Sequence, residues 1–148
     1  MGVDIPLSPY NLLQEVYIDD PWKIMMSCIM LNLTNRRQVD TVREELFRRW
    51  PDPISMSTAD PNELGLLIQP LGLYKKRAAS MRRFSDEWIN KPSMKGGIKD
   101  LHGIGQYGSD SWDIFVMGEL PVSVKDHVLT RYVEWRNKLL IGKIDGWD

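Results

Sequence analysis

One stretch limits the possible folds of this chain more than any other: a short glycine turn, followed about twenty residues later by an aspartate at the start of a helix. Gly103 and Gly105 flank Ile104 between two helical patterns, and Asp126 and His127 stand where a further apolar-periodic helix begins. Glycine allows left-handed backbone conformations, and a helix that begins near Gly105 directs its free N–H groups toward an anion. Such a turn can bind a phosphate. Its glycine spacing alone, however, is equally typical of an ordinary turn between two helices.

Apolar residues recur at helical spacing along most of the chain. The pattern predicts a buried central helix over Trp22–Leu33, a helix over Arg36–Trp50 and an amphipathic helix over Lys75–Ile89. No stretch alternates between apolar and polar residues over a useful length. We therefore predict an all-α fold with about seven to ten helices.

Three residue pairs that end in proline mark helix starts. Ser8-Pro9 predicts a short helix through Tyr17, with Ser8 as its N-cap. Asp20-Pro21 opens the central helix in the same way, and Asp60-Pro61 opens a later one.

Length and composition bound the class of protein. The 148 residues predict one domain over residues 1–148, with residues 1–7 and 141–148 as poorly ordered tails. The single cysteine, Cys28, lies in an apolar run and is expected in the core; one cysteine excludes an internal disulfide and a four-cysteine iron–sulfur cluster. No secretory signal or membrane span is recognisable, so we expect a cytosolic or nuclear protein.

Positive charge is concentrated near the glycine turn, although the chain as a whole carries a net charge of −1. Between Lys75 and Asp110 there are eight cations and four anions. Any one of these cations is best interpreted as part of a solvated helix face. As a set beside the turn, they form a plausible phosphate-binding surface.

The longer string around the turn resembles a known family. Leu101-His102-Gly103-Ile104-Gly105-Gln106-Tyr107-Gly108, followed by Asp126, resembles the helix-hairpin-helix DNA glycosylase superfamily. Other segments are similar to the glycosylase domain of the methyl-CpG-binding-domain thymine DNA glycosylases: Ser8–Glu15, Asp20–Lys23, Pro70–Tyr74, Phe84–Glu87 and Asp126-His127. The resemblance covers roughly Ser8 to Leu139 and implies two helical lobes with a cleft between them, without an iron–sulfur cluster.

The resemblance implies that Asp126 and Tyr107 are catalytic and that Tyr107 and Gln14 line the pocket for an extruded base. Breaking an N-glycosidic bond builds positive charge on the sugar, which a fixed carboxylate can stabilise while it orients or deprotonates the attacking water. An amide both donates and accepts hydrogen bonds, as the Watson–Crick edge of thymine or uracil requires. From the residues alone, Asp126 is also interpretable as a plain N-cap and Gln14 as an exposed polar residue.

DNA contacts are implied at four places in the chain. Leu33 would enter the gap left by the flipped base, and the loop Leu71-Gly72-Leu73 would insert an apolar wedge, with Leu71 preferred over Leu73. The remaining implied contacts are Gly103, Ile104, Gly105 and Gln106 of the hairpin and His127 beside Asp126.

Three positions depart from related sequences. Bifunctional members of the superfamily have a lysine at the position of Tyr107, so the resemblance implies water as the nucleophile and no lyase activity by that route. The thymine glycosylases have arginine at Leu33, and leucine cannot donate hydrogen bonds to the estranged guanine. They also have lysine where this chain has Val128.

No cofactor is expected. Two histidines and one cysteine, widely spaced, do not form a usual zinc site. The resemblance implies at most a structural monovalent cation on the backbone carbonyls of Lys99, Leu101 and Ile104 when DNA is bound.

The sequence therefore predicts a monofunctional, mismatch-directed glycosylase that acts as a monomer on double-stranded DNA in the nucleus and removes thymine or uracil opposite guanine. One alternative is another base specificity, such as adenine in a mispair, for which Glu15 is the one candidate acid near Gln14. A second alternative is a helix-hairpin-helix module that binds DNA without catalysis.

Overall fold

The computed structural model describes residues 5–90, 96–121 and 123–144, apart from the side chains of residues 143 and 144. Within these ranges the chain is helical and contains no strand, as predicted. The elements in chain order are α1 (Leu13–Val16), α2 (Pro21–Leu31), α3 (Arg36–Asp40), α4 (Arg43–Arg49), α5 (Pro53–Ser57), α6 (Pro61–Leu67), η1 (Gln69–Leu71), α7 (Tyr74–Asn90), η2 (Gly97–Asp100), α8 (Gln106–Phe115) and α9 (His127–Ile144).

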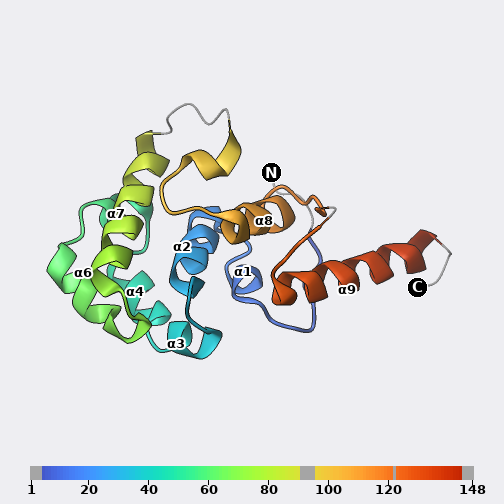
Figure 1. Cartoon of the computed structure of the whole chain (residues 1–148), viewed down its shortest axis with the longest axis horizontal. Helices are drawn as coiled ribbons and strands as arrows, with labels where there is room; N and C mark the ends of the chain where they lie inside the picture. The colour runs from blue at the N-terminus through green and yellow to red at the C-terminus, as the bar shows by residue number, and fades with distance from the viewer. Residues whose placement is uncertain (1–4, 91–95, 122, 145–148) are drawn as a thin grey trace.

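Helix α2 lies between two groups of helices. Figure 1 shows α4, α6 and α7 on one side of it, α3 below it, and α1, α8 and α9 on the other side. Helix α2 packs against α7 and α8, and α1 packs against both α2 and α8. Helix α2 therefore contacts both groups of helices.

The start of α2 follows from its first residues. Asp20 Oδ1 accepts a hydrogen bond from Lys23 N at 3.1 Å, and Pro21 occupies the first helical position, where its missing N–H has no cost. Ile24, Met25 and Met26 are fully buried. The predicted buried central helix is confirmed.

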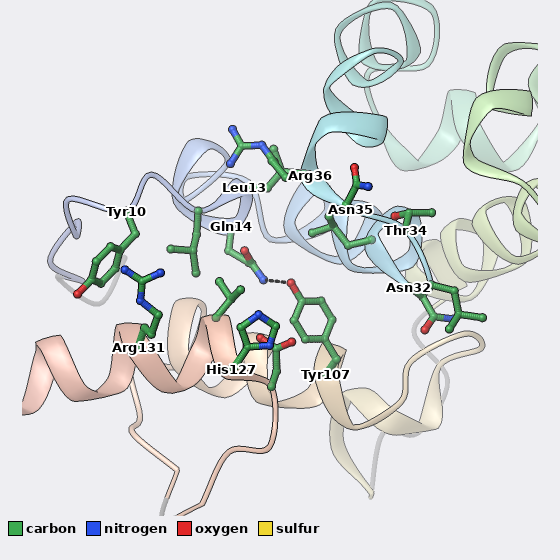
Figure 2. Close-up of a pocket in the computed structure, with 15 residues that line it drawn as sticks. Tyr10, Leu13, Gln14, Asn32, Thr34, Asn35, Arg36, Tyr107, His127 and Arg131 are labelled. Carbon is green, nitrogen blue, oxygen red and sulfur yellow. Dashed lines mark hydrogen bonds between the residues drawn. The ribbon is translucent and has the colours of Figure 1, made fainter.

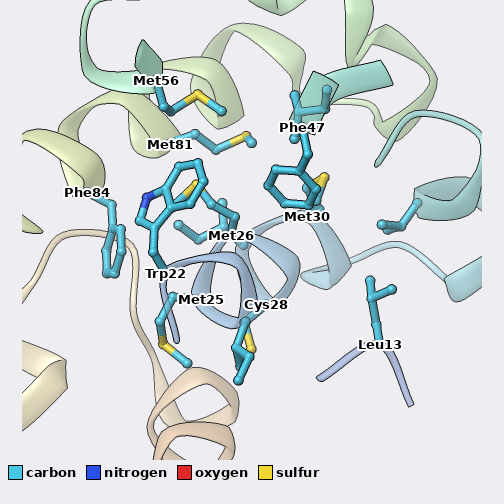
Figure 3. Close-up of a cluster of buried hydrophobic side chains, with 14 of the residues drawn as sticks. Leu13, Trp22, Met25, Met26, Cys28, Met30, Phe47, Met56, Met81 and Phe84 are labelled. Carbon is cyan, nitrogen blue, oxygen red and sulfur yellow. The ribbon is translucent and has the colours of Figure 1, made fainter. Parts of the chain in front are cut away.

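The core around α2 is rich in methionine. Figure 3 shows Met25, Met26 and Met30 from α2 beside Met56 and Met81 from the neighbouring helices. Unbranched thioether side chains fill irregular space between helices well. Trp22 anchors the same cluster, because its Nε1 donates to Ser85 Oγ at 2.9 Å. Cys28 is buried here, as expected.

The prediction of one helix over Arg36–Trp50 is wrong, since the segment forms α3 and α4. Thr41 Oγ1 donates to the Gln38 carbonyl at 2.7 Å, and Val42 leaves the helical region with φ −121° and ψ −23°. A hydroxyl that competes for a backbone carbonyl weakens a helix at that point. Helix α5, capped by Asp52, was not predicted.

The prediction of a helix from Ser8 through Tyr17 is also wrong. Only Leu13–Val16 is helical, and Ser8–Leu12 forms a loop closed by the carboxylate of Glu15. Ser8 donates to this carboxylate from both N and Oγ, the latter at 2.7 Å, and Leu12 N donates to it at 2.9 Å. Ser8 therefore binds Glu15 instead of capping a helix.

The expected tails are partly described. Tyr132 Oη donates to the Pro6 carbonyl at 2.7 Å, and α9 continues to Ile144. Residues 1–4 and 145–148 lie outside the described residues, as do Lys91 and Lys95 of the basic segment. Among the helices that are described, none is both long and apolar enough to cross a bilayer.

Glu15→Gln should destabilise the fold. The substitution places an NH2 group against N–H and O–H donors in a site where Glu15 is 6% exposed. The expected loss is about 1–3 kcal/mol in the free energy of unfolding, from unsatisfied buried donors. Urea unfolding followed by circular dichroism measures it. Glu44→Gln, at an exposed position, is the matched control, and equal stabilities for the two variants would contradict this role of Glu15.

Candidate active site

A pocket of about 570 Å³ opens between the two groups of helices. Its walls come from the N-terminal loop, α1, the end of α2, the first turn of α8 and the start of α9. Figure 2 shows Gln14, Tyr107 and His127 converging on it from three of these elements. The pocket brings together five of the predicted site residues: Gln14, Leu33, Tyr107, Asp126 and His127.

Gln14 and Tyr107 line this pocket and are hydrogen-bonded to each other. Gln14 is 1% exposed, and its Nε2 donates to Tyr107 Oη at 2.7 Å and to Ser111 Oγ at 3.1 Å. Both amide hydrogens are thus used, while no described residue donates to Gln14 Oε1. The pair therefore presents one free acceptor, Gln14 Oε1, and one free donor, the hydroxyl hydrogen of Tyr107.

Two buried groups beside the pocket stay protonated at neutral pH. Burial is the main cause that raises the pKa of the Tyr107 phenol. Burial likewise raises the pKa of Cys28 to about 12. Because the thiolate is the reactive form of cysteine, Cys28 is not a nucleophile here.

Asp126 is both a helix cap and a pocket residue. Its Oδ2 accepts from Leu129 N at 2.9 Å, at the start of α9. Among the described residues none donates to its Oδ1, and the residue is half-buried in the pocket wall. The N-terminus of a long helix stabilises negative charge. One oxygen is thus fixed by the fold while the other is available to a substrate or a water.

Ser111 was missed by sequence reasoning. It is fully buried on α8, one turn after Tyr107, and holds the Gln14 amide. A serine on the buried face of an amphipathic helix is a weak signal, and only the position of α1 shows what it contacts.

The glycine turn joins η2 to α8 as predicted. Gly103 has φ 87°, a conformation that side chains resist, and Gly105 precedes α8 without a side-chain cap. Helix α8 therefore begins with N–H groups open to an anion. Ile104 is half-buried against the core, so this residue offers its backbone more than its side chain.

The turn is fixed to α7 through His102. His102 N donates to Glu87 Oε1 at 2.8 Å, and its Nε2 lies 3.2 Å from Ser80 Oγ. On the other side, Gln106 accepts from Lys99 Nζ at 2.8 Å and donates to Asp110 at 2.7 Å. A cation on the carbonyls of Lys99, Leu101 and Ile104 stays a prediction. The described residues contain no cluster of three or more His, Cys, Asp or Glu side chains able to hold a metal.

The preference for Leu71 over Leu73 is wrong. Leu71 is 3% exposed and packs in the core, whereas Leu73 is 56% exposed with φ 47°. The side chain available to a partner on this loop is therefore Leu73. Leu33, at the end of α2, is 82% exposed with φ 59°.

Comparison with known proteins identifies the family of this chain. A family model described as HhH-GPD superfamily base excision DNA repair protein matches residues 26–137. The chain is 36% identical over 131 residues to the methyl-CpG-binding domain protein 4-like protein of Arabidopsis thaliana, covering 88% of this chain and 29% of the relative. It is 28% identical over 120 residues to the thymine/uracil-DNA glycosylase of Pyrobaculum aerophilum, covering 78% of this chain and 52% of the relative.

Solved structures share the fold. A thermostable thymine-DNA glycosylase superposes with a TM-score of 0.65 at 22% identity, covering 72% of this chain and 51% of that one. An endonuclease III trapped as a covalent intermediate with DNA gives the same TM-score at 20% identity, covering 73% and 53%. This chain spans about half or less of the length of the curated relatives named above. By its family match and its helical fold, the chain belongs to the HhH-GPD superfamily of base excision DNA repair proteins.

Proposed function

We propose that this chain is a monofunctional DNA glycosylase that removes thymine or uracil mispaired with guanine and leaves an abasic site. The observation that carries the proposal is the pairing of Gln14 and Tyr107 in the pocket that Asp126 also lines. Gln14 Oε1 can accept from the N3–H of thymine or uracil, and Tyr107 can donate to a carbonyl of the same base. Relatives named as thymine and thymine/uracil glycosylases support this substrate class.

Asp126 supplies the chemistry in this proposal. As the bond to the base breaks, positive charge develops on the sugar and negative charge on the departing base. A carboxylate held at the pocket wall stabilises that cation and orients the attacking water. Oδ2 is held by Leu129 N, which leaves Oδ1 for this task.

The proposed absence of lyase activity rests on the nucleophiles available. Strand cleavage through a Schiff base needs an amine close to the sugar. Tyr107 occupies the position at which bifunctional relatives have lysine, and among the described residues no lysine lines the pocket. Water is then the nucleophile.

The geometry of Glu15 argues against adenine as the substrate. Removal of adenine is helped by an acid that protonates the base. Glu15 does not line the pocket, and its carboxylate accepts from Ser8 and Leu12. It is committed to closing the N-terminal loop.

Asp126→Asn should abolish base release while DNA binding persists. Asparagine caps a helix as well as aspartate does, so α9 stays capped, but the negative charge is lost. We expect the single-turnover rate on a G·U duplex to fall by about 100-fold or more. Asp60→Asn changes the N-cap of α6 in the same way outside the pocket and should keep the wild-type rate. Equal rates for Asp126→Asn and wild type would rule Asp126 out as the catalytic carboxylate.

Because of Leu33, we expect the protein to excise its target base opposite bases other than guanine as well. Its exposed side chain can fill space in a duplex but cannot donate a hydrogen bond to an unpaired guanine. We expect Leu33→Arg to raise the ratio of G·U to A·U excision rates by roughly 5- to 150-fold, which corresponds to the discrimination of about 1–3 kcal/mol typical of an arginine–guanine pair. Leu33→Met, which adds no donor, is the control. A wild-type protein as strict as the arginine variant would contradict this role.

A further inference from the structure

Arg77 is a buried arginine without a carboxylate partner. It is 5% exposed on α7, and among the described residues none of the ion pairs includes it. Burial lowers its pKa. A buried guanidinium needs compensation from its surroundings. Here that compensation comes from backbone carbonyls.

These carbonyls belong to two separate segments. Arg77 Nη1 donates to the Ile29 carbonyl in the last turn of α2 at 3.0 Å. Its Nε donates to the Gly72 carbonyl at 2.9 Å, and its Nη2 lies 3.4 Å from the Leu71 carbonyl. The planar fork of one side chain thus holds the end of α2 against the loop after η1.

Gln38 forms a second connection between the same two segments. Its Oε1 accepts from Asn35 N at 3.0 Å, just after the end of α2, and its Nε2 donates to the Pro70 carbonyl at 3.3 Å. The segments 29–35 and 70–73 are therefore joined at two points.

Each segment carries an exposed leucine in a left-handed conformation. Asn32 has φ −64° and ψ 120°, Leu33 has φ 59°, and Thr34 N donates to the Leu31 carbonyl at 3.2 Å. This has the form of a type II turn, in which glycine or asparagine is normal at the position of Leu33. Leu73, with φ 47°, immediately precedes α7. Such strain persists where the surrounding contacts fix the backbone, and it concentrates at functional sites.

We infer that Arg77 is a positioning residue that fixes the spacing between Leu33 and Leu73 so that both apolar side chains enter the duplex together. The inference rests on the proposed function. Separating stacked bases costs free energy, and an apolar wedge offsets this cost best when its side chains are already in place. Displacement of a positioned group by about 1 Å is enough to lower a rate by two orders of magnitude.

The test is a double-mutant cycle on a G·U duplex with 2-aminopurine beside the uracil. Two readouts are followed: the 2-aminopurine fluorescence rise, which reports base unstacking, and the single-turnover release of uracil. Arg77→Met should lower both the fluorescence rise and the rate, the rate by roughly tenfold to a hundredfold. Arg77→Lys, which keeps the charge but not the fork, should fall between Arg77→Met and wild type.

In the Leu33→Ala/Leu73→Ala background, Arg77→Met should change the rate by less than about twofold, because the groups that it positions are gone. Arg48→Met removes an exposed arginine paired with Glu45 and is the control for loss of charge. Thermal melting of every variant sets an assay temperature at which all are folded.

The same rate loss in both backgrounds, or no loss in the wild-type background, would overturn the inference. A fluorescence rise in wild type without any uracil release would contradict the proposed function alone. The loss of that rise in Arg77→Met would then still support the role of Arg77. No fluorescence rise in wild type would overturn the role of Arg77, and the proposed function would fall with it only if uracil release were absent as well.

Discussion

The hydrogen-bonded contact between α1 and α8 is the interaction on which the site depends. Gln14 on α1 reaches Tyr107 and Ser111 on α8, more than ninety positions later in the chain. An amide in a buried site stays in one orientation only when its hydrogen bonds are satisfied, and these two bonds use both hydrogens of Gln14. The contact therefore leaves the amide oxygen and the phenolic hydrogen to face the pocket. Without it, the pocket would have no defined pattern of donors and acceptors for a base.

Helix α2 makes that contact possible, because α1, α7 and α8 all pack against it. Its end also carries the strained turn with Leu33, which Arg77 fixes to the loop that bears Leu73. The buried helix α2 thus connects the pocket with the side chains proposed to enter the duplex. The glycine turn before α8 adds open N–H groups beside the same site.

Features set by neighbours in the sequence could be predicted, and those set by distant contacts could not. The caps at Asp20 and Asp60, and the start of α8 after Gly105, depend on adjacent residues and are confirmed. Ser8 has the sequence of an N-cap, but its groups are taken by Glu15. The burial of Leu71 likewise depends on how the helices pack. The break at Thr41 is an exception with a local cause, the hydrogen bond from its hydroxyl to the Gln38 carbonyl, which the apolar pattern does not reveal.

The site residues divide in the same way. The resemblance to DNA glycosylases pointed to Gln14, Tyr107 and Asp126, and they do line one pocket. Ser111 and Arg77 were not singled out, since a serine in an amphipathic helix and one cation in a basic segment carry no signal by themselves. Their importance comes from the groups that they meet: the Gln14 amide for Ser111, and three carbonyls for Arg77.

The most direct measurement uses a labelled duplex with a single G·T or G·U pair, incubated with excess protein and divided into two halves, one of which is treated with hot alkali. The account predicts strand scission only in the alkali-treated half, because water is the nucleophile and an abasic site is the product. Scission without alkali would contradict the monofunctional mechanism. No scission in either half, with the duplex still bound, would contradict the assignment of this pocket to thymine or uracil excision.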